Sequence, residues 1–136
     1  MNKSIPSLIL CFLVLAAACH KKPTPVNYGV KFDGTWVGIN SCDSSTKTIT
    51  FLSPINNFNS VYYSDSVDTG LCAKLVTFYG TAFGDTITFP PATYTDLCGN
   101  GYTVQQTGTI IGVTLYLTRI TTGTQDDTCV FVATKI

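Results

Sequence analysis

Residues 80–89 read GTAFGDTITF and residues 108–117 read GTIIGVTLYL, so the pattern G-T-x-x-G-x-T-apolar-x-apolar occurs twice, 28 residues apart. The second glycine of each copy suits a tight hairpin turn, because such turns need a positive φ at which a Cβ atom would clash. After that glycine, threonine alternates with apolar residues, and a period of two is typical of a half-buried antiparallel strand. The repeat therefore predicts two β-hairpins.

The same alternation recurs through the rest of the chain. Thr is the commonest residue at 22 of 136, aromatic residues make up 12%, and Glu is absent, which favours strands over helices. We therefore predict an all-β fold, a small eight-stranded antiparallel up-and-down barrel. The predicted strands are 35–42, 46–53, 59–66, 73–80, 85–90, 102–110, 113–120 and 128–135.

Four cysteines fall at one end of this predicted barrel. Four cysteines allow three pairings, and sequence alone does not select one. A closed barrel pairs its first strand with its last, which favours Cys42–Cys129 and leaves Cys72–Cys98 to join two loops at the same rim. A zinc site is excluded, because structural zinc sites need cysteines two to four residues apart and the nearest two here are 26 apart.

The N-terminus has the features of an export signal. Lys3 precedes an apolar stretch over 5–18, which is too short for a transmembrane helix and ends in the sequence LAAAC at 15–19. This ending resembles a bacterial lipobox, which implies that residues 1–18 are removed and that Cys19 carries diacylglycerol. The alternative is an ordinary signal peptide cut after Ala18, which would leave Cys19 as an odd free thiol.

Residues 19–33 are predicted to form the lipid anchor and a flexible tether. Two lysines and two prolines within residues 19–25 suit an extended, solvated linker. Lys21 and Lys22 either attract anionic headgroups or are simply soluble linker residues, and the sequence leaves both interpretations open.

Four short motifs are shared with a known family: GTW at 34–36, GDTIT at 84–88, GVTL at 112–115 and CVFVATK at 129–135. Through these motifs, residues 34–136 resemble the small lipocalin-like β-barrel lipoproteins of Gram-negative bacteria. The resemblance implies a barrel in the compartment of its lipid anchor, at the outer membrane, with the leaflet undetermined, and it implies no particular function. True lipocalins are less similar, because their arginine in the last strand is absent and Arg119 lies in the strand before.

Composition argues against several classes of function. The net charge is zero, so nothing favours nucleic acid as a partner. The single His, at position 20, and the lack of a G-x-S-x-G or phosphate-loop motif argue against an enzyme. Asp126 and Asp127 are adjacent but suit a solvated turn better than a catalytic pair, and no calcium-loop pattern is present. We expect no catalytic residue, metal or cofactor.

Recognition is expected at the rim that carries the cysteines, because the tether enters at the other end. Candidate contacts there are Tyr94, Tyr102, Arg119 and Asp126, and the acidic residues of the rim are expected to be solvated loop charges. Expected partners are the membrane through the N-terminal lipid, and an unknown envelope protein, glycan or small hydrophobic ligand.

We consider two functions for a barrel with this rim. The favoured one is a non-catalytic binding or interaction module that uses its rim loops. The alternative is a carrier of a small hydrophobic ligand or lipid inside the barrel, although a filled barrel is slightly favoured. Trp36 is expected to close the tether end of the core rather than to serve as a ligand platform.

Overall fold

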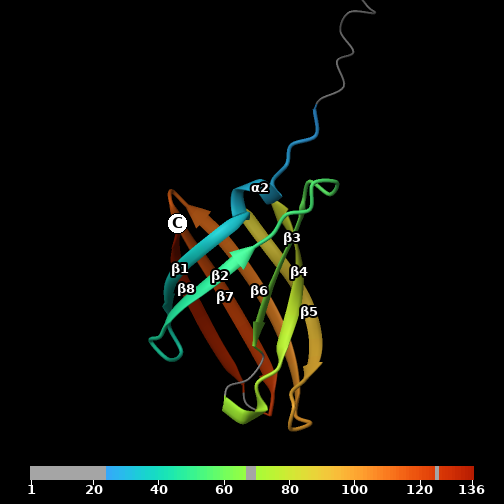
Figure 1. Cartoon of the computed structure of the whole chain (residues 1–136), viewed down its shortest axis with the longest axis vertical. Helices are drawn as coiled ribbons and strands as arrows, with labels where there is room; N and C mark the ends of the chain where they lie inside the picture. Colours follow the sequence, from blue (N-terminus) through green and yellow to red (C-terminus); the bar gives the residue numbers. More distant parts are fainter. Residues whose placement is uncertain (1–23, 67–69, 125) are drawn as a thin grey trace, which may run out of the picture.

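The computed structural model describes residues 24–66, 70–124 and 126–136, so the predicted signal peptide and Cys19 lie outside the described residues. The chain forms one antiparallel sheet with strand order β2-β1-β8-β7-β6-β5-β4-β3, which curls into a barrel (Figure 1). The elements are α2 Gly29–Phe32, β1 Gly34–Asn40, β2 Thr46–Phe51, β3 Ser60–Ser66, η1 Gly70–Cys72, β4 Leu75–Phe83, β5 Thr86–Thr95, β6 Gly101–Ile111, β7 Thr114–Gly123 and β8 Asp127–Lys135.

Pairing of the first strand with the last closes most of the barrel, as predicted. β1 and β8 are antiparallel partners from Trp36↔Lys135 to Asn40↔Phe131. Gly38 permits this pairing, because a Cβ atom there would lie only 2.0 Å from the Val132 carbonyl oxygen. Between β2 and β3, the backbone pairing seen among the described residues is the isolated bridge Leu52↔Tyr62, just after the end of β2, so the barrel is nearly closed.

The two repeats form hairpins, as predicted. Gly84 lies between β4 and β5 with φ +61°, and Gly112 lies between β6 and β7 with φ +63°. Both values are in the left-handed region that glycine adopts without a steric penalty.

The fifth strand is longer than predicted. It was expected to end at Pro90, but β5 continues to Thr95, with a shift of register between Phe89 and Ala92. Prolines cannot donate to a neighbouring strand, and a bulge is where a strand tolerates them. The connection to β6, predicted over 91–101, is therefore only 96–100.

Both predicted disulfides are present at the end of the barrel opposite α2. Cys42–Cys129 has a Cα–Cα distance of 5.3 Å and joins the end of β1 to β8. Cys72–Cys98 has a Cα–Cα distance of 5.2 Å and joins η1 to the turn between β5 and β6. We call this end the cysteine rim.

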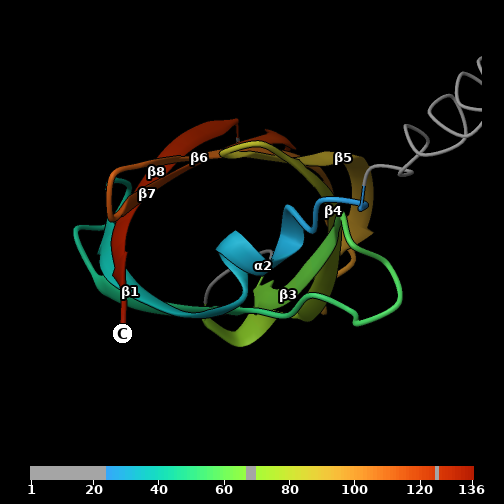
Figure 2. The same cartoon turned by 90° about the horizontal axis from the view of Figure 1, so that it is seen from above.

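The opposite end of the barrel is filled. α2 lies across it (Figure 2), with Phe32 fully buried and its carbonyl accepting a hydrogen bond of 2.8 Å from Trp36 Nε1. Trp36 is 2% exposed, which confirms its predicted place in the core. The buried hydrophobic residues are Phe32, Trp36, Ile49, Phe51, Val61, Tyr63, Val76, Phe78, Ala82, Ile87, Phe89, Tyr102, Val104, Leu115, Leu117, Phe131 and Ala133.

Part of the predicted tether belongs to the folded domain. The Gly29 N–H donates to the Phe58 carbonyl, and the Asp33 carboxylate accepts a hydrogen bond from the Ser53 N–H. The Tyr28 ring packs on Phe83, with ring centroids 5.2 Å apart. In the part of the chain that the structure describes, no helix is long and apolar enough to cross a membrane.

Candidate binding site at the cysteine rim

A cavity of about 310 Å³ opens at the cysteine rim, at the low end of the size range of small-molecule sites. The barrel is thus filled at the α2 end and hollow at the rim, so the expectation of a filled interior holds for only part of it. Apolar and aromatic side chains from β2, β3, β6, β7 and β8 form its wall, with charged side chains nearer the mouth. The lining residues are Asn40, Cys42, Asp43, Lys47, Ile49, Tyr63, Asp65, Ser66, Tyr102, Leu117, Arg119, Thr121, Asp127, Cys129 and Phe131.

Three charged residues form a cluster in this wall. The Asp65 carboxylate accepts hydrogen bonds from Lys47 Nζ at 2.5 Å and from Arg119 Nη1 at 3.1 Å. Arg119 Nη2 also donates to the Ser66 carbonyl, and its guanidinium lies 5.5 Å from the centroid of the Phe78 ring. With two cations and one anion, the charged cluster Lys47–Asp65–Arg119 carries a net charge of +1.

The strand period explains why these charges face inward. In β2, Lys47 is two residues from the buried Ile49, and in β3, Asp65 is two residues from the buried Tyr63. Arg119 likewise follows the buried Leu117 in β7. Their side chains are 30%, 13% and 16% exposed, respectively, so water screens them less than it screens loop charges.

Hydrogen-bond donors beside the charged cluster lack acceptors. Gln106 and Arg119 are opposite each other in the β6–β7 pairing. Among the described residues, Gln106 Nε2 and Arg119 Nε are buried and have no hydrogen-bond partner. Buried donors are nearly always satisfied, so this level of the barrel suits a ligand or solvent atom that accepts hydrogen bonds.

Tyr63 borders the same region. Its hydroxyl donates to Gln106 Oε1, and its ring contacts those of Phe51, Phe78 and Phe89. Burial raises the pKa of the Tyr63 hydroxyl well above its usual value, and the nearby charge of Asp65 raises it further. The phenol therefore stays neutral at physiological pH and fixes the Gln106 carboxamide in place.

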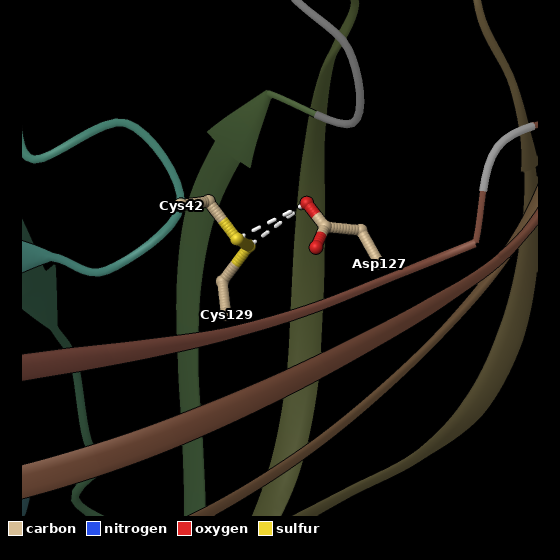
Figure 3. A group of neighbouring side chains, drawn as sticks. All are labelled: Cys42, Asp127 and Cys129. Atoms are coloured by element: carbon tan, nitrogen blue, oxygen red, sulfur yellow. Dashed lines mark hydrogen bonds between the residues drawn. A yellow bond between two sulfur atoms is a disulfide. The ribbon is translucent and has the colours of Figure 1, made fainter.

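The mouth of the cavity carries the Cys42–Cys129 disulfide. Asp127 Oδ2 lies 3.1 Å from Cys42 Sγ and 3.2 Å from Cys129 Sγ (Figure 3). Disulfide sulfurs have no proton to donate, so we interpret both as close contacts rather than hydrogen bonds. These three side chains could only act together as metal ligands after reduction, because metal-binding cysteines are thiolates.

A second aspartate at the mouth organises a turn. Asp43 Oδ1 accepts hydrogen bonds from the Ser45 N–H, the Ser45 hydroxyl and Asn40 Nδ2. The hydrogen bonds from Ser45 lower the pKa of the Asp43 carboxyl below its usual value. Asp43 therefore stays ionised and adds negative charge at the mouth.

The four predicted contact residues are in different places. Arg119 and Tyr102 line the cavity, and Tyr102 is only 9% exposed. Tyr94 lies within β5, half-buried, with its ring edge-on to Phe78, and burial raises the pKa of its hydroxyl. Asp126 is exposed and accepts a hydrogen bond from the Gly123 N–H. The structure thus turns three of the four toward the barrel interior.

Sequence reasoning did not find the charged cluster. Asp65 was expected among the solvated acidic residues of the rim, Arg119 was expected as a separate contact residue, and Lys47 and Gln106 were assigned no role. The available signal was a charged residue two positions from an apolar one in an alternating strand. Asp96 also departs from that expectation, since it is 5% exposed and accepts hydrogen bonds from Cys98 and Asn100 in the β5–β6 turn.

No protein family, curated protein or solved structure matches this chain.

Proposed function

We propose that this chain is a lipid-anchored binding protein of the outer membrane, resembling lipocalin-like lipoproteins, with recognition at the cysteine rim and the cavity beneath it. Diacylglycerol on Cys19 would be the membrane anchor. α2 and the N-terminus of β1 lie at the opposite end of the barrel from the rim (Figure 1), so the cavity would face away from the attachment point.

The observation that carries this proposal is the combination of a positive charged cluster with apolar walls. Lys47 Nζ donates to Asp65, and an ammonium group has three hydrogens to donate. Ile49, Leu117 and Phe131 supply apolar surface in the same cavity. Such a site suits a small amphipathic molecule whose carboxylate or phosphate group meets the two cations.

A second candidate function is a module that binds a larger partner through its rim loops. Leu71 and Leu97 are 98% and 69% exposed, and a hydrogen bond from the Leu97 N–H to the Cys72 carbonyl holds their two loops together. Exposed apolar side chains on paired loops suit contact with an envelope protein.

The chemistry of the site favours binding over catalysis. Among the residues the structure describes there is no histidine, and all four cysteines are oxidised. The Asp65 carboxylate already accepts from two cations and from the Ser66 N–H. Its oxygens are thus engaged by groups of the protein itself, which suits a structural role better than proton transfer to a substrate.

Calorimetric titration with hexanoate, hexyl phosphate and hexanol tests the ligand class. We expect one or both anions to bind at least about tenfold more tightly than hexanol, since a charge-assisted hydrogen bond contributes about 1.5–3 kcal/mol. Arg119→Met and Lys47→Met should each remove that preference. Lys74→Met removes a positive charge from an exposed site outside the cavity and is the matched control. Equal binding of all three compounds, or no binding of any, would refute this ligand class.

Mass spectrometry of the protein extracted from membranes tests the anchor. The expected mature N-terminus is Cys19 carrying diacylglycerol, and Cys19→Ser should release the protein from the outer-membrane fraction on washing without detergent. An unmodified N-terminus at residue 19 would contradict the anchor without affecting the titration result.

A further inference from the structure

The two ends of the barrel differ in which side chains they expose. At the α2 end, the loops and turns present a group of exposed apolar side chains, which we call the apolar tip. Phe83 and Val113, beside the β4–β5 and β6–β7 turns, are 74% and 78% exposed, and Ile55, in the β2–β3 loop, is 88% exposed. The members of the apolar tip are Val26, Val30, Ile55, Phe58, Phe83, Ile111, Val113 and Ile136.

The charges at the same end are compensated. Lys31 Nζ is 2.5 Å from Asp85 Oδ1, and Asp33 accepts a hydrogen bond from the Ser53 N–H. Lys135 Nζ lies 5.8 Å from the centroid of the Trp36 ring. The four charged side chains at this end therefore sum to zero.

The cysteine rim has the opposite character. Among the residues that the structure describes, the rim carries five aspartates and three cations, which gives a net charge of −2. They are Asp43, Asp65, Asp96, Asp126 and Asp127 on one side, and Lys47, Lys74 and Arg119 on the other. An anionic surface would therefore repel the rim and accept the apolar tip.

We propose that the apolar tip is a membrane-contacting surface, which seats the barrel on the headgroup region of a phospholipid bilayer with the cysteine rim outward. The position of the proposed anchor in the sequence favours a bilayer, rather than another protein, as the partner of this surface. Cys19, the anchor in the proposed function, is ten residues before Gly29, where the packed domain begins, so at most about 36 Å of chain separates them. Any lipid on Cys19 would hold this end, rather than the rim, near the bilayer.

The energetics suit a reversible contact. Exposed aromatic and aliphatic side chains on turns can enter the boundary between headgroups and acyl chains, and the tip has eight of them. Residues 21 and 22, both lysines, precede the tip in sequence and would add electrostatic attraction to anionic lipids. One acyl-anchored cysteine plus this surface would then fix the orientation of the barrel as well as its location.

Vesicle flotation of the mature chain carrying Cys19→Ser tests the surface without the anchor, using phosphatidylethanolamine and phosphatidylglycerol vesicles. We expect measurable binding that falls at least about tenfold in the variant Phe83→Ser with Val113→Ser, since both side chains would lose their apolar contact. The matched control is Leu71→Ser with Leu97→Ser, which removes exposed apolar side chains from the rim and should bind as the parent does. Equal loss in both variants, or no binding by the parent, would overturn the proposal.

Fluorescence quenching by brominated lipids tests the orientation of the lipidated chain in the same vesicles. Tryptophan in the variant Phe83→Trp should be quenched strongly, whereas in Leu97→Trp it should be quenched no more than the buried Trp36 of the parent. Similar quenching of both would contradict a fixed orientation. Light scattering of the Cys19→Ser chain tests whether a second copy of the chain covers the tip instead. A dimer that dissociates in the Phe83→Ser variant would assign the tip to self-association and overturn the proposal. Failure of acylation would refute the anchor but leave the flotation result standing.

Discussion

At the residue scale, the charged cluster shows how a polar group is kept inside a barrel this small. Asp65 offsets two cations that would otherwise repel each other in a poorly screened site. Replacing all three members by apolar side chains of similar volume is often neutral for such clusters, whereas removing one partner is costly. The cluster is therefore weak evidence for a role in stability, which agrees with the ligand-binding role that we propose for it.

Asp65→Asn should lower the free energy of unfolding by about 2 kcal/mol, because Lys47 and Arg119 then lose their counter-charge while partly buried. Asp85→Asn breaks an ion pair whose side chains are 46% and 60% exposed and should cost less than about 1 kcal/mol. Urea unfolding of both variants measures the difference. Equal effects would mean that the cluster is as well screened as the surface pair.

Tyr63 should make the protein sensitive to alkali. Its pKa in the folded protein lies above the unfolded value of about 10, so its contribution to stability is present below pH 10 and is lost as the pH rises above that value. Urea unfolding at pH 9 and pH 11 should show a smaller loss in Tyr63→Phe than in the parent. At pH 9 the variant should itself be less stable by about 1–2 kcal/mol, because Gln106 Oε1 loses its donor. A parallel decline of both proteins would contradict the burial of the hydroxyl.

At the scale of elements, the two disulfides differ in the length of chain they close. Cys42–Cys129 spans 87 residues and Cys72–Cys98 spans 26. Loop-closure entropy for these lengths gives about 4.6 and about 3.6 kcal/mol, respectively. Serine replacement of the first pair should therefore lower the unfolding free energy more than replacement of the second. Denaturation of the two double variants measures this, and a reversed order would indicate that the β1–β8 seam holds without its covalent link.

The strands and hairpins could be predicted because their signals are local. Alternation of Thr with apolar residues marks β5 and β7, and Gly84 and Gly112 mark their turns. The course of β5 past Pro90 could not be predicted, because a bulge is set by the pairing of β5 with β6. α2 was missed because its four residues are too short for helical periodicity.

The candidate site was harder to predict than the fold. Its charged cluster joins side chains from β2, β3 and β7, so it depends on the curvature of the whole barrel rather than on any one segment. Sequence reasoning placed Asp65 and Arg119 at the correct end, but treated Asp65 as a solvated charge and Arg119 as a separate contact residue. The inward direction of Asp65 could have been inferred from Tyr63 two residues earlier.

At the scale of the whole molecule, the barrel has a filled, apolar end and a hollow, charged end. α2 and Trp36 close the first, and the Cys42–Cys129 disulfide lies at the mouth of the second. In the function we propose, the first end is the point of attachment and the second is the site of recognition. We propose that the cavity at the cysteine rim binds a small amphipathic acid.

Native mass spectrometry of the mature protein, purified from its own membranes in mild detergent, tests that claim most directly. The expected result is a co-purified small molecule with a carboxylate or phosphate group, retained by Lys74→Met and lost from the double variant Lys47→Met with Arg119→Met. An empty barrel in the parent protein, or the same bound molecule in the double variant, would contradict the claim.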